Sequence, residues 1–251
     1  MRTILESAKK TEKNLASSAL YKTYSNRTVV NNVSIEIKSG EIVGLLGANG
    51  AGKTTVFSMI SGLVQPDSGE IFLNGRPITQ MPIYERARFG LGYLPQESSI
   101  FRRMTVAQNV MSVLELMPYT KEERRKYLNS LLNELKITEI SNSKGYSLSG
   151  GERRRVEIAR SLAMSPSFLL MDEPFSGIDP IIVAEIQTMV RGLTRFGIGV
   201  LITDHNVREA LNIADRAYIL HEGQIIESGN PSKLIDSKKA RTAYLGDNFK
   251  L

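Results

Sequence analysis

A glycine-rich stretch in the first quarter of the chain has the residue types that bind phosphate. It holds glycines, a lysine and two threonines in the order Gly47, Ala48, Asn49, Gly50, Ala51, Gly52, Lys53, Thr54, Thr55. This spacing matches the phosphate loop, whose backbone N–H groups turn inward around phosphate oxygens. An apolar run at 42–46 precedes it and helical spacing follows it, so a helix N-terminus would add a favourable dipole. We predict that the loop binds ATP, with Lys53 on the β- and γ-phosphates and Thr54 on Mg²⁺.

Two adjacent acids follow a second apolar run, at 168–171. Phosphoryl transfer depends on positioning and charge neutralisation, so a phosphate loop needs a carboxylate that orders the metal and a group that orients the attacking water. We predict that the apolar run is a buried strand whose carboxyl end presents both. Asp172 is assigned to Mg²⁺ through water, and Glu173 is assigned as the base that polarises the nucleophile.

A second candidate for anion binding lies at Leu148-Ser149-Gly150-Gly151-Glu152. A serine hydroxyl, two glycine amides and a predicted helix start would make such a surface, too far along the chain to be the first one. We therefore interpret Ser149, Gly150 and Gly151 as the cap over the nucleotide of another subunit. This segment resembles the signature of the ABC (ATP-binding cassette) ATPases, and the resemblance extends over almost the whole chain.

The resemblance assigns further residues in chain order. It implies that Gln96 is the Q-loop residue, contacting the metal and the reacting groups, and that Asp179 belongs to a D-loop at the nucleotide. His205, after Thr203-Asp204, is similar to the switch histidine that contacts the γ-phosphate. Tyr24 resembles the aromatic residue that stacks on adenine, with Tyr21 as the alternative. Ala48 replaces the proline of many relatives, which changes loop stiffness more than chemistry.

These side chains need a scaffold of alternating strands and helices. Short apolar runs predict strands at 33–37, 41–46, 70–73, 92–94, 168–171 and 199–203, and a closing hairpin at 217–227 around Glu222-Gly223. Helical spacing predicts a helix through Val56, Ile60 and Leu63 that stops near Gly62, and another at 121–136 with a leucine stripe. This alternation of strands and helices along the chain favours an α/β fold with a largely parallel central sheet. The family resemblance adds an antiparallel β-subdomain and a helical subdomain.

The predicted organisation is a loose N-terminal leader at 1–13 and a single ATPase domain at 14–251. The helical subdomain is expected at about 97–160, inserted in the core.

Composition excludes several function classes. The chain has 251 residues, of which 41% are hydrophobic, enough for a substantial core. It contains no cysteine and two histidines, which excludes disulfides and thiolate metal sites and disfavours a zinc cluster. No apolar run reaches the roughly 18 to 20 residues of a membrane span, and the start does not read as a secretory signal. A cytosolic location fits these features. The net charge of +6 permits attraction to nucleic acid or anionic lipid, although a solvated lysine-rich surface is the simpler interpretation.

The transported substrate must be inferred from less general segments. Residues 94–106, 149–160, 172–180, 203–209 and the tail 244–249 resemble the ATPases of lipopolysaccharide export. That resemblance implies a homodimer on the cytoplasmic face of the inner membrane, beneath two integral membrane permease subunits. The ATPases of branched-chain amino acid uptake share a similar Phe-x-Arg-Met-Thr-Val stretch and are the alternative.

A soluble ABC ATPase acting on ribosomes or DNA is a different class of function. Arg153, Arg154 and Arg155 would suit phosphate backbones. The chain has a single motif set and no sustained heptads, so we expect no nucleic acid partner.

A partner groove is predicted just after the Q-loop. Phe101, Arg102 and Arg103 would line it and receive a coupling helix of the permease, with Phe101 as the apolar anchor. The competing interpretation is a core phenylalanine followed by solvated arginines.

Overall fold

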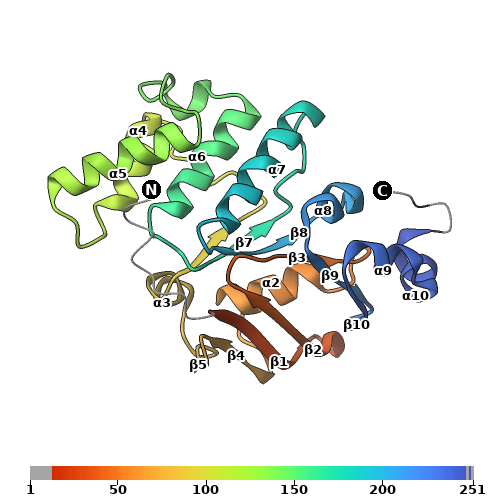
Figure 1. Cartoon of the computed structure of the whole chain (residues 1–251). Helices are drawn as coiled ribbons and strands as arrows, with labels where there is room; N and C mark the ends of the chain where they lie inside the picture. The colour runs from red at the N-terminus through yellow and green to blue at the C-terminus, as the bar shows by residue number, and fades with distance from the viewer. Residues whose placement is uncertain (1–12, 247–248, 250–251) are drawn as a thin grey trace.

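The computed structural model describes residues 13–246 and 249 (Figure 1). Most of the predicted leader, 1–13, lies outside the described residues, as do Asp247 and Asn248 of the tail. Lys13 is described, and its Nζ donates to Ser167 Oγ at 3.0 Å. None of the helices in the described ranges is long and apolar enough to cross a membrane.

The central sheet has six strands in the order β10-β9-β3-β8-β7-β6. They are β3 (Ile42–Leu46), β6 (Leu91–Leu94), β7 (Phe168–Asp172), β8 (Gly199–Thr203), β9 (Arg216–His221) and β10 (Gln224–Gly229). Neighbouring strands are parallel, except that β10 is antiparallel to β9. Every residue of β3, β7 and β8 is buried, as expected for parallel strands that are covered on both faces. The predicted α/β fold with a mostly parallel sheet is confirmed.

A second, antiparallel sheet has the order β2-β1-β4-β5. Its strands are β1 (Asn14–Tyr24), β2 (Arg27–Lys38), β4 (Ser68–Leu73) and β5 (Arg76–Pro77). The closing hairpin β9–β10 also forms as predicted, because Glu222 (φ 46°) and Gly223 (φ 78°) both adopt the positive φ that a two-residue hairpin turn of this kind requires.

Helices fill the spaces around the sheets (Figure 1). They are α2 (Lys53–Ser61), α3 (Ile83–Arg88), α4 (Val106–Leu114), α5 (Lys121–Glu134), η1 (Gly145–Ser147), α6 (Gly150–Leu162), α7 (Pro180–Thr194), α8 (Val207–Ile213), α9 (Pro231–Asp236), α10 (Lys238–Ala240) and η2 (Arg241–Leu245). Thr105, Thr120 and Ser149 begin α4, α5 and α6 with capping boxes, in which each side chain pairs with the residue three positions later.

Helix α2 lies between the two sheets, because it contacts β1 and β2 on one side and β6 and β7 on the other. It ends at Ser61, where Gly62 caps it in the left-handed conformation (φ 88°). The predicted stop is therefore correct, but the assignment of Leu63 to the apolar face of the helix is wrong. Leu63 follows the cap and is 53% exposed.

A buried arginine holds the C-terminal end of α2. Arg86 is 0% exposed and donates only to backbone oxygens, those of Met81 (2.8 Å), Met59, Ile60 and Thr79 (2.7 Å each). Burial lowers the pKa of Arg86 to about 10, so the guanidinium remains charged at neutral pH. Its charge complements the negative end of the helix dipole, whose positive end points into the phosphate loop.

Helices α4, α5 and α6 form an arm at one end of the molecule (Figure 1). The predicted leucine stripe of α5 packs inward, since Leu128, Leu131, Leu132 and Leu135 are all buried. These helices fall mainly in the range expected for the helical subdomain, whose boundaries stay a prediction.

Candidate functional site

The phosphate loop connects β3 to α2, so its position follows from the buried strand and from the helix packed between the sheets. Gly50 (φ 79°) and Gly52 (φ 106°) supply the left-handed turns that curl the backbone. Lys53 is the first residue of α2 and is buried. Its Nζ donates to Gly47 O at 2.7 Å and to Ala48 O at 3.0 Å, which holds the ammonium group above the loop.

Burial lowers the pKa of Lys53, and the negative charges of Glu173, Asp172 and Asp204 oppose that effect. These carboxylates come from the ends of two other strands, so the fold brings three acids close to one lysine. A site with this balance of charge can receive the phosphates of a nucleotide together with a divalent cation.

Asp172 is the last residue of β7 and is buried. Burial, and next the charge of Glu173, raises the pKa of Asp172 to about 6, while Arg154 and Lys53 act in the opposite direction. The next residue, Glu173, has a positive φ of 45°, a strained conformation for a side chain of this type. Its N–H donates to Thr203 O at the end of β8 (2.8 Å), which fixes the turn that aims its carboxylate.

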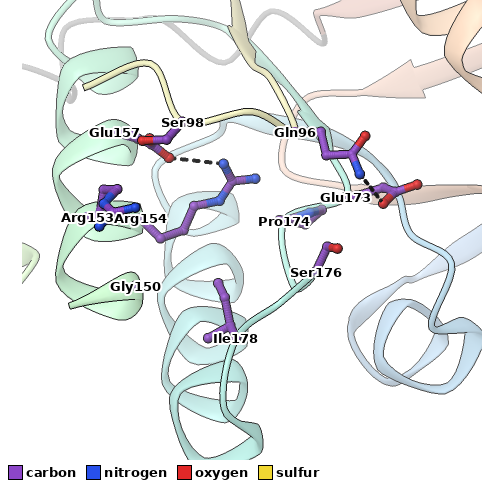
Figure 2. A pocket seen from close by; sticks show the side chains of 10 residues that line it. All are labelled: Gln96, Ser98, Gly150, Arg153, Arg154, Glu157, Glu173, Pro174, Ser176 and Ile178. Carbon is purple, nitrogen blue, oxygen red and sulfur yellow. Dashed lines mark hydrogen bonds and ion pairs between the residues drawn. The ribbon is translucent and has the colours of Figure 1, made fainter. Parts of the chain in front are cut away.

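Two residues predicted from separate motifs, Gln96 and His205, converge on the carboxylate of Glu173. Gln96 Nε2 donates to Glu173 Oε2 at 2.8 Å, and His205 Nδ1 lies 3.3 Å from the same oxygen. Figure 2 shows the contact between Gln96 and Glu173. Gln96 follows β6 and His205 follows β8, so the carboxyl ends of neighbouring parallel strands assemble the cluster. These two contacts orient the carboxylate of Glu173.

The signature segment begins α6 at some remove from Lys53. Ser149 is exposed and accepts from Glu152 N–H at 3.3 Å, while its own Oγ donates to Glu152 Oε2 at 2.7 Å. Gly150 is exposed, whereas Gly151 packs so closely that an added Cβ would lie 2.5 Å from Ile182 Cγ2. Within the described ranges Ser149 has no hydrogen bond to the phosphate loop. An exposed helix start of this kind is available to a second molecule.

Asp179 is exposed at the start of α7, where its Oδ1 accepts from Ile181 N–H at 2.9 Å. A small pocket of about 120 Å³ separates the D-loop from the signature helix (Figure 2). Gly150, Gln96, Glu173 and Ser176 are among its lining residues, so this pocket joins the D-loop, the Q-loop and the start of α6.

Tyr24 and Tyr21 differ in how freely their rings can stack. Tyr24 is the last residue of β1 and 45% exposed, with Lys22 Nζ 5.5 Å from its ring centroid. Tyr21 is half-buried and pairs with Ser68 of β4 in the middle of the sheet. The hairpin that follows Tyr24 reaches the phosphate loop, where residues 27–29, 48–51 and 221–223 line a pocket of about 450 Å³. This placement favours Tyr24 for contact with a base.

Phe101, Arg102 and Arg103 are exposed, so the interpretation of Phe101 as a core residue is wrong. The Phe101 ring is 47% exposed and lies 4.5 Å below the guanidinium of Arg160. Its backbone is held by the buried Asn109, whose Oδ1 accepts from Phe101 N–H at 2.8 Å and whose Nδ2 donates to Phe101 O at 3.1 Å. An exposed aromatic ring on a fixed backbone is a suitable anchor for a partner.

The basic triplet of α6 is not the solvated patch that nucleic acid binding would need. Arg154 is 5% exposed, and its Nη1 donates to Glu157 Oε2 (3.1 Å) and to Pro95 O (3.0 Å). Arg155 forms an ion pair with Glu185. Sequence reasoning missed the pair of Arg154 and Glu157, although an arginine three residues before a glutamate on a helix is a signal that could have suggested it.

The residues proposed for Mg²⁺ are a hydroxyl (Thr54), an amide (Gln96) and a carboxylate (Asp172). The described part of the chain has no cluster of three or more acidic or histidine side chains that could hold a metal alone. Mg²⁺ prefers oxygen ligands and commonly takes only one or two from protein, with water and phosphates completing its shell. The donor set of Thr54, Gln96 and Asp172 therefore fits Mg²⁺ bound together with a nucleotide.

Comparisons with known proteins give a consistent result. The family model described as ABC transporter matches residues 30–176. The chain is 57% identical over 237 residues to the lipopolysaccharide export system ATP-binding protein LptB of Acidithiobacillus ferridurans, covering 94% of this chain and 98% of that protein. It is 50% identical over 242 residues to LptB of Escherichia coli (strain K12), covering 96% and 98%.

Solved structures agree in fold. An ATP-binding cassette of an ABC transporter in its ADP conformation superposes with a TM-score of 0.84 at 27% identity, covering 94% of this chain and all of that one. A dimeric structure of a bacterial ABC transporter cassette has a TM-score of 0.77 at 26% identity, covering 86% and 98%.

Proposed function

This chain belongs to the ABC transporter family, as an ATP-binding and ATP-hydrolysing subunit, and we propose that it powers the export of lipopolysaccharide from the inner membrane to the outer membrane. The observation that carries the proposal is the identity of 50–57%, over nearly the whole chain, to proteins named as lipopolysaccharide export subunits. Branched-chain amino acid uptake, the alternative drawn from sequence, is not favoured by these relatives.

The nucleotide site is assembled from the residues predicted for it. Tyr24 stacks on adenine. The backbone of the phosphate loop surrounds the phosphates, and its residues are Gly47, Ala48, Asn49, Gly50, Ala51 and Gly52. Thr55, in the first turn of α2, also binds the nucleotide. Lys53 exchanges its bonds to Gly47 O and Ala48 O for the β- and γ-phosphates. Burial lowers the pKa of Lys53, and the nearby carboxylates of Glu173, Asp172 and Asp204 oppose that shift. Thr54, Gln96 and, through water, Asp172 would hold Mg²⁺, which neutralises charge on the phosphate oxygens.

Glu173 acts as the base in hydrolysis. Its carboxylate accepts a proton from the attacking water, once Gln96 and His205 have given up their contacts with Oε2. Gln96 then faces the metal site, and His205 contacts the γ-phosphate.

Two chains form the working unit. The exposed Ser149, Gly150 and Asp179, with Gly151 behind them, meet the nucleotide of the partner subunit, so that ATP is enclosed between two copies. ATP favours this closed dimer only through contacts that the open one lacks, and the signature serine and glycine amides are such contacts. The dimeric cassette with the same fold supports this arrangement.

The dimer works on the cytoplasmic face of the inner membrane, peripheral to two integral permease subunits. Phe101, Arg102 and Arg103 receive a coupling helix of a permease, so that dimer closure moves the membrane partners. The exposed ring of Phe101, on a backbone clamped by Asn109, supports its role as anchor.

Purification from detergent-solubilised membranes tests the transported substrate. The tagged chain is expected to bring down permeases of lipopolysaccharide export, identified by mass spectrometry. Amino acid permeases in their place would leave the ATPase assignment standing and overturn the substrate.

The same preparation tests the groove. Phe101→Ala is expected to reduce permease recovery at least ten-fold with nucleotide affinity unchanged, since an anchor residue commonly contributes 2 kcal/mol or more. Leu116→Ala removes another exposed apolar side chain, at 79% exposure, and is the matched control. Equal recovery of permease with the two variants would refute the assignment of Phe101 as the anchor of the partner groove.

A further inference from the structure

Asp204 is a buried carboxylate close to the proposed base Glu173, and the hydrolysis step does not use it. It follows β8 directly and precedes His205, and its side chain is 0% exposed. Burying a carboxylate costs free energy unless hydrogen bonds or opposite charges compensate for it. The hydrogen-bond partners of Asp204 therefore show what its burial achieves.

The two carboxylate oxygens of Asp204 accept hydrogen bonds from two different turns. Oδ2 accepts from the N–H of Phe175 at 3.1 Å, and Oδ1 accepts from the N–H of Asn206 at 2.8 Å. Phe175 lies two residues after Glu173, in the turn that follows β7. Asn206 lies directly after His205 and is the N-cap of α8. One short side chain thus connects the turn that carries the base with the turn that carries the histidine.

The same two turns are also joined through the backbone. The N–H of Glu173 donates to the carbonyl oxygen of Thr203 at 2.8 Å, where β7 and β8 end side by side. Glu173 is therefore held through its own N–H by Thr203, and two residues later the chain is held again by Asp204. Such support suits Glu173, because its positive φ of 45° is a strained conformation that the surrounding structure must maintain.

His205 is close to both carboxylates. Its Nδ1 lies 3.3 Å from Glu173 Oε2 and 3.6 Å from Asp204 Oδ1. The side chain of His205 is 54% exposed, so its position depends more on the backbone that carries it than on packing. The contact between Glu173 and His205 consequently depends on how the two turns are fixed relative to each other.

Aspartate is the residue that can make this pair of bonds. Each of its two oxygens accepts one N–H, and the side chain is short enough to bond the N–H two residues further along the chain. Asparagine could still accept from Asn206 in this local turn, but its NH₂ group would then face the N–H of Phe175, a donor against a donor. The connection between the turns thus requires a carboxylate at a position that is 0% exposed.

We propose that Asp204 is a positioning residue for ATP hydrolysis, which ties the turn that carries the general base Glu173 to the turn that carries His205. It acts through the orientation of Glu173 and needs no contact with the nucleotide. This inference rests on the proposed role of Glu173 as the base. It adds to that role the bond that keeps the turn of the base in place.

Asp204→Asn tests this role in the purified full-length chain. The variant keeps the volume and removes the bond to Phe175, so kcat for ATP hydrolysis should fall about ten-fold while the KM for MgATP changes by less than about two-fold. Rates are expressed per nucleotide site, counted by titration with a fluorescent ADP analogue and Mg²⁺, so that unfolded protein does not contribute. An unchanged kcat per site would overturn the proposal.

Asp215→Asn is the matched control. Asp215 Oδ2 also accepts a backbone N–H, that of Ile42 at 2.8 Å, and its Oδ1 accepts from Arg191 Nη1 at 2.7 Å. The bond to Ile42 lies at the amino end of β3, opposite to the end that leads into the phosphate loop. This variant should lower the Tm and leave kcat and KM per site at their parental values. A loss of kcat equal to that of Asp204→Asn would contradict a specific role for Asp204.

A double variant tests whether Asp204 acts through Glu173. In a chain that already carries Glu173→Gln, Asp204→Asn should slow hydrolysis by less than about two-fold more, because positioning a base has no effect once the base is absent. A further loss of about ten-fold would mean that the two residues act independently, and the proposal would fail. Hydrolysis at the parental rate by Glu173→Gln alone would instead remove the proposed role of Glu173.

The N–H of Phe175 can also be removed by itself, by replacing Phe175 with phenyllactate, its α-hydroxy acid. This change leaves Asp204 intact and should give a similar loss of kcat, again with KM nearly unchanged. A parental kcat here would refute the proposal even if Asp204→Asn failed to fold.

Discussion

Replacing Arg86 tests how the molecule fixes the helix that carries the phosphate loop. The side chain donates four hydrogen bonds to buried backbone oxygens, and two of these oxygens belong to α2. Arg86→Met keeps much of the volume but removes all four hydrogen bonds, although Met59 O keeps the N–H of Gly62 as a donor. At about 1 kcal/mol each, the expected loss of unfolding free energy is about 4 kcal/mol. For a domain of this size, that lowers the Tm by roughly 8 to 16 °C.

Thermal unfolding followed by circular dichroism measures this loss. Arg88→Met is the matched control, because Arg88 lies on the same helix and is exposed, with its guanidinium 5.9 Å from the Tyr84 ring centroid. It should shift the Tm by no more than about 2 °C, as for an ordinary surface substitution. Arg86→Lys should fall between the two, since an ammonium group cannot reproduce the planar fork. Equal Tm values for Arg86→Met and Arg88→Met would refute the reasoning.

Three further predictions concern the site directly. Glu173→Gln should still bind ATP but hydrolyse it at least 100-fold more slowly, as expected for loss of a general base, and a phosphate-release rate near the parental value would remove Glu173 from that role. Gly151→Ala should lower the free energy of unfolding by about 1 to 3 kcal/mol, because its Cβ would lie 2.5 Å from Ile182, whereas Gly150→Ala meets no atom within 4 Å; similar urea midpoints would contradict this. Burial, with the charge of Glu173, raises the pKa of Asp172 from 3.8 to about 6, so the folded protein keeps a proton that the unfolded chain releases, and stability contributed by this group falls as pH rises from about 4 to about 6. Asp172→Asn should flatten that part of the urea stability profile, and an unchanged slope would count against the buried carboxylate as its source.

Contiguous motifs were the most predictable part of the protein. The phosphate loop, from Gly47 to Thr54, follows β3 and opens α2, so its local sequence contains both the turn chemistry and the elements that flank it. Strand β7 was equally clear, because its first four residues, 168–171, are buried and form an uninterrupted apolar run. The end of α2 was partly misjudged at Leu63, since the cap at Gly62 outweighs helical spacing.

Contacts between residues that lie far apart in the sequence were harder to predict. Family resemblance pointed to Gln96 and His205, but nothing in their spacing gives their contacts with one oxygen of Glu173. The burial of Arg154 and Arg86 was not foreseen, because arginine is mostly exposed and the carbonyl groups that satisfy these two come from other segments.

The sequence by itself determined the type of chemistry and the α/β architecture, because phosphate binding, strand burial and helix capping depend on residues within a few positions of one another. Only the tertiary structure decided which oxygen Gln96 and His205 share and which arginines are buried. Those features depend on strand order and on helix packing. A parallel sheet places the carboxyl ends of strands side by side in an order, β3-β8-β7-β6, that differs from their order along the chain.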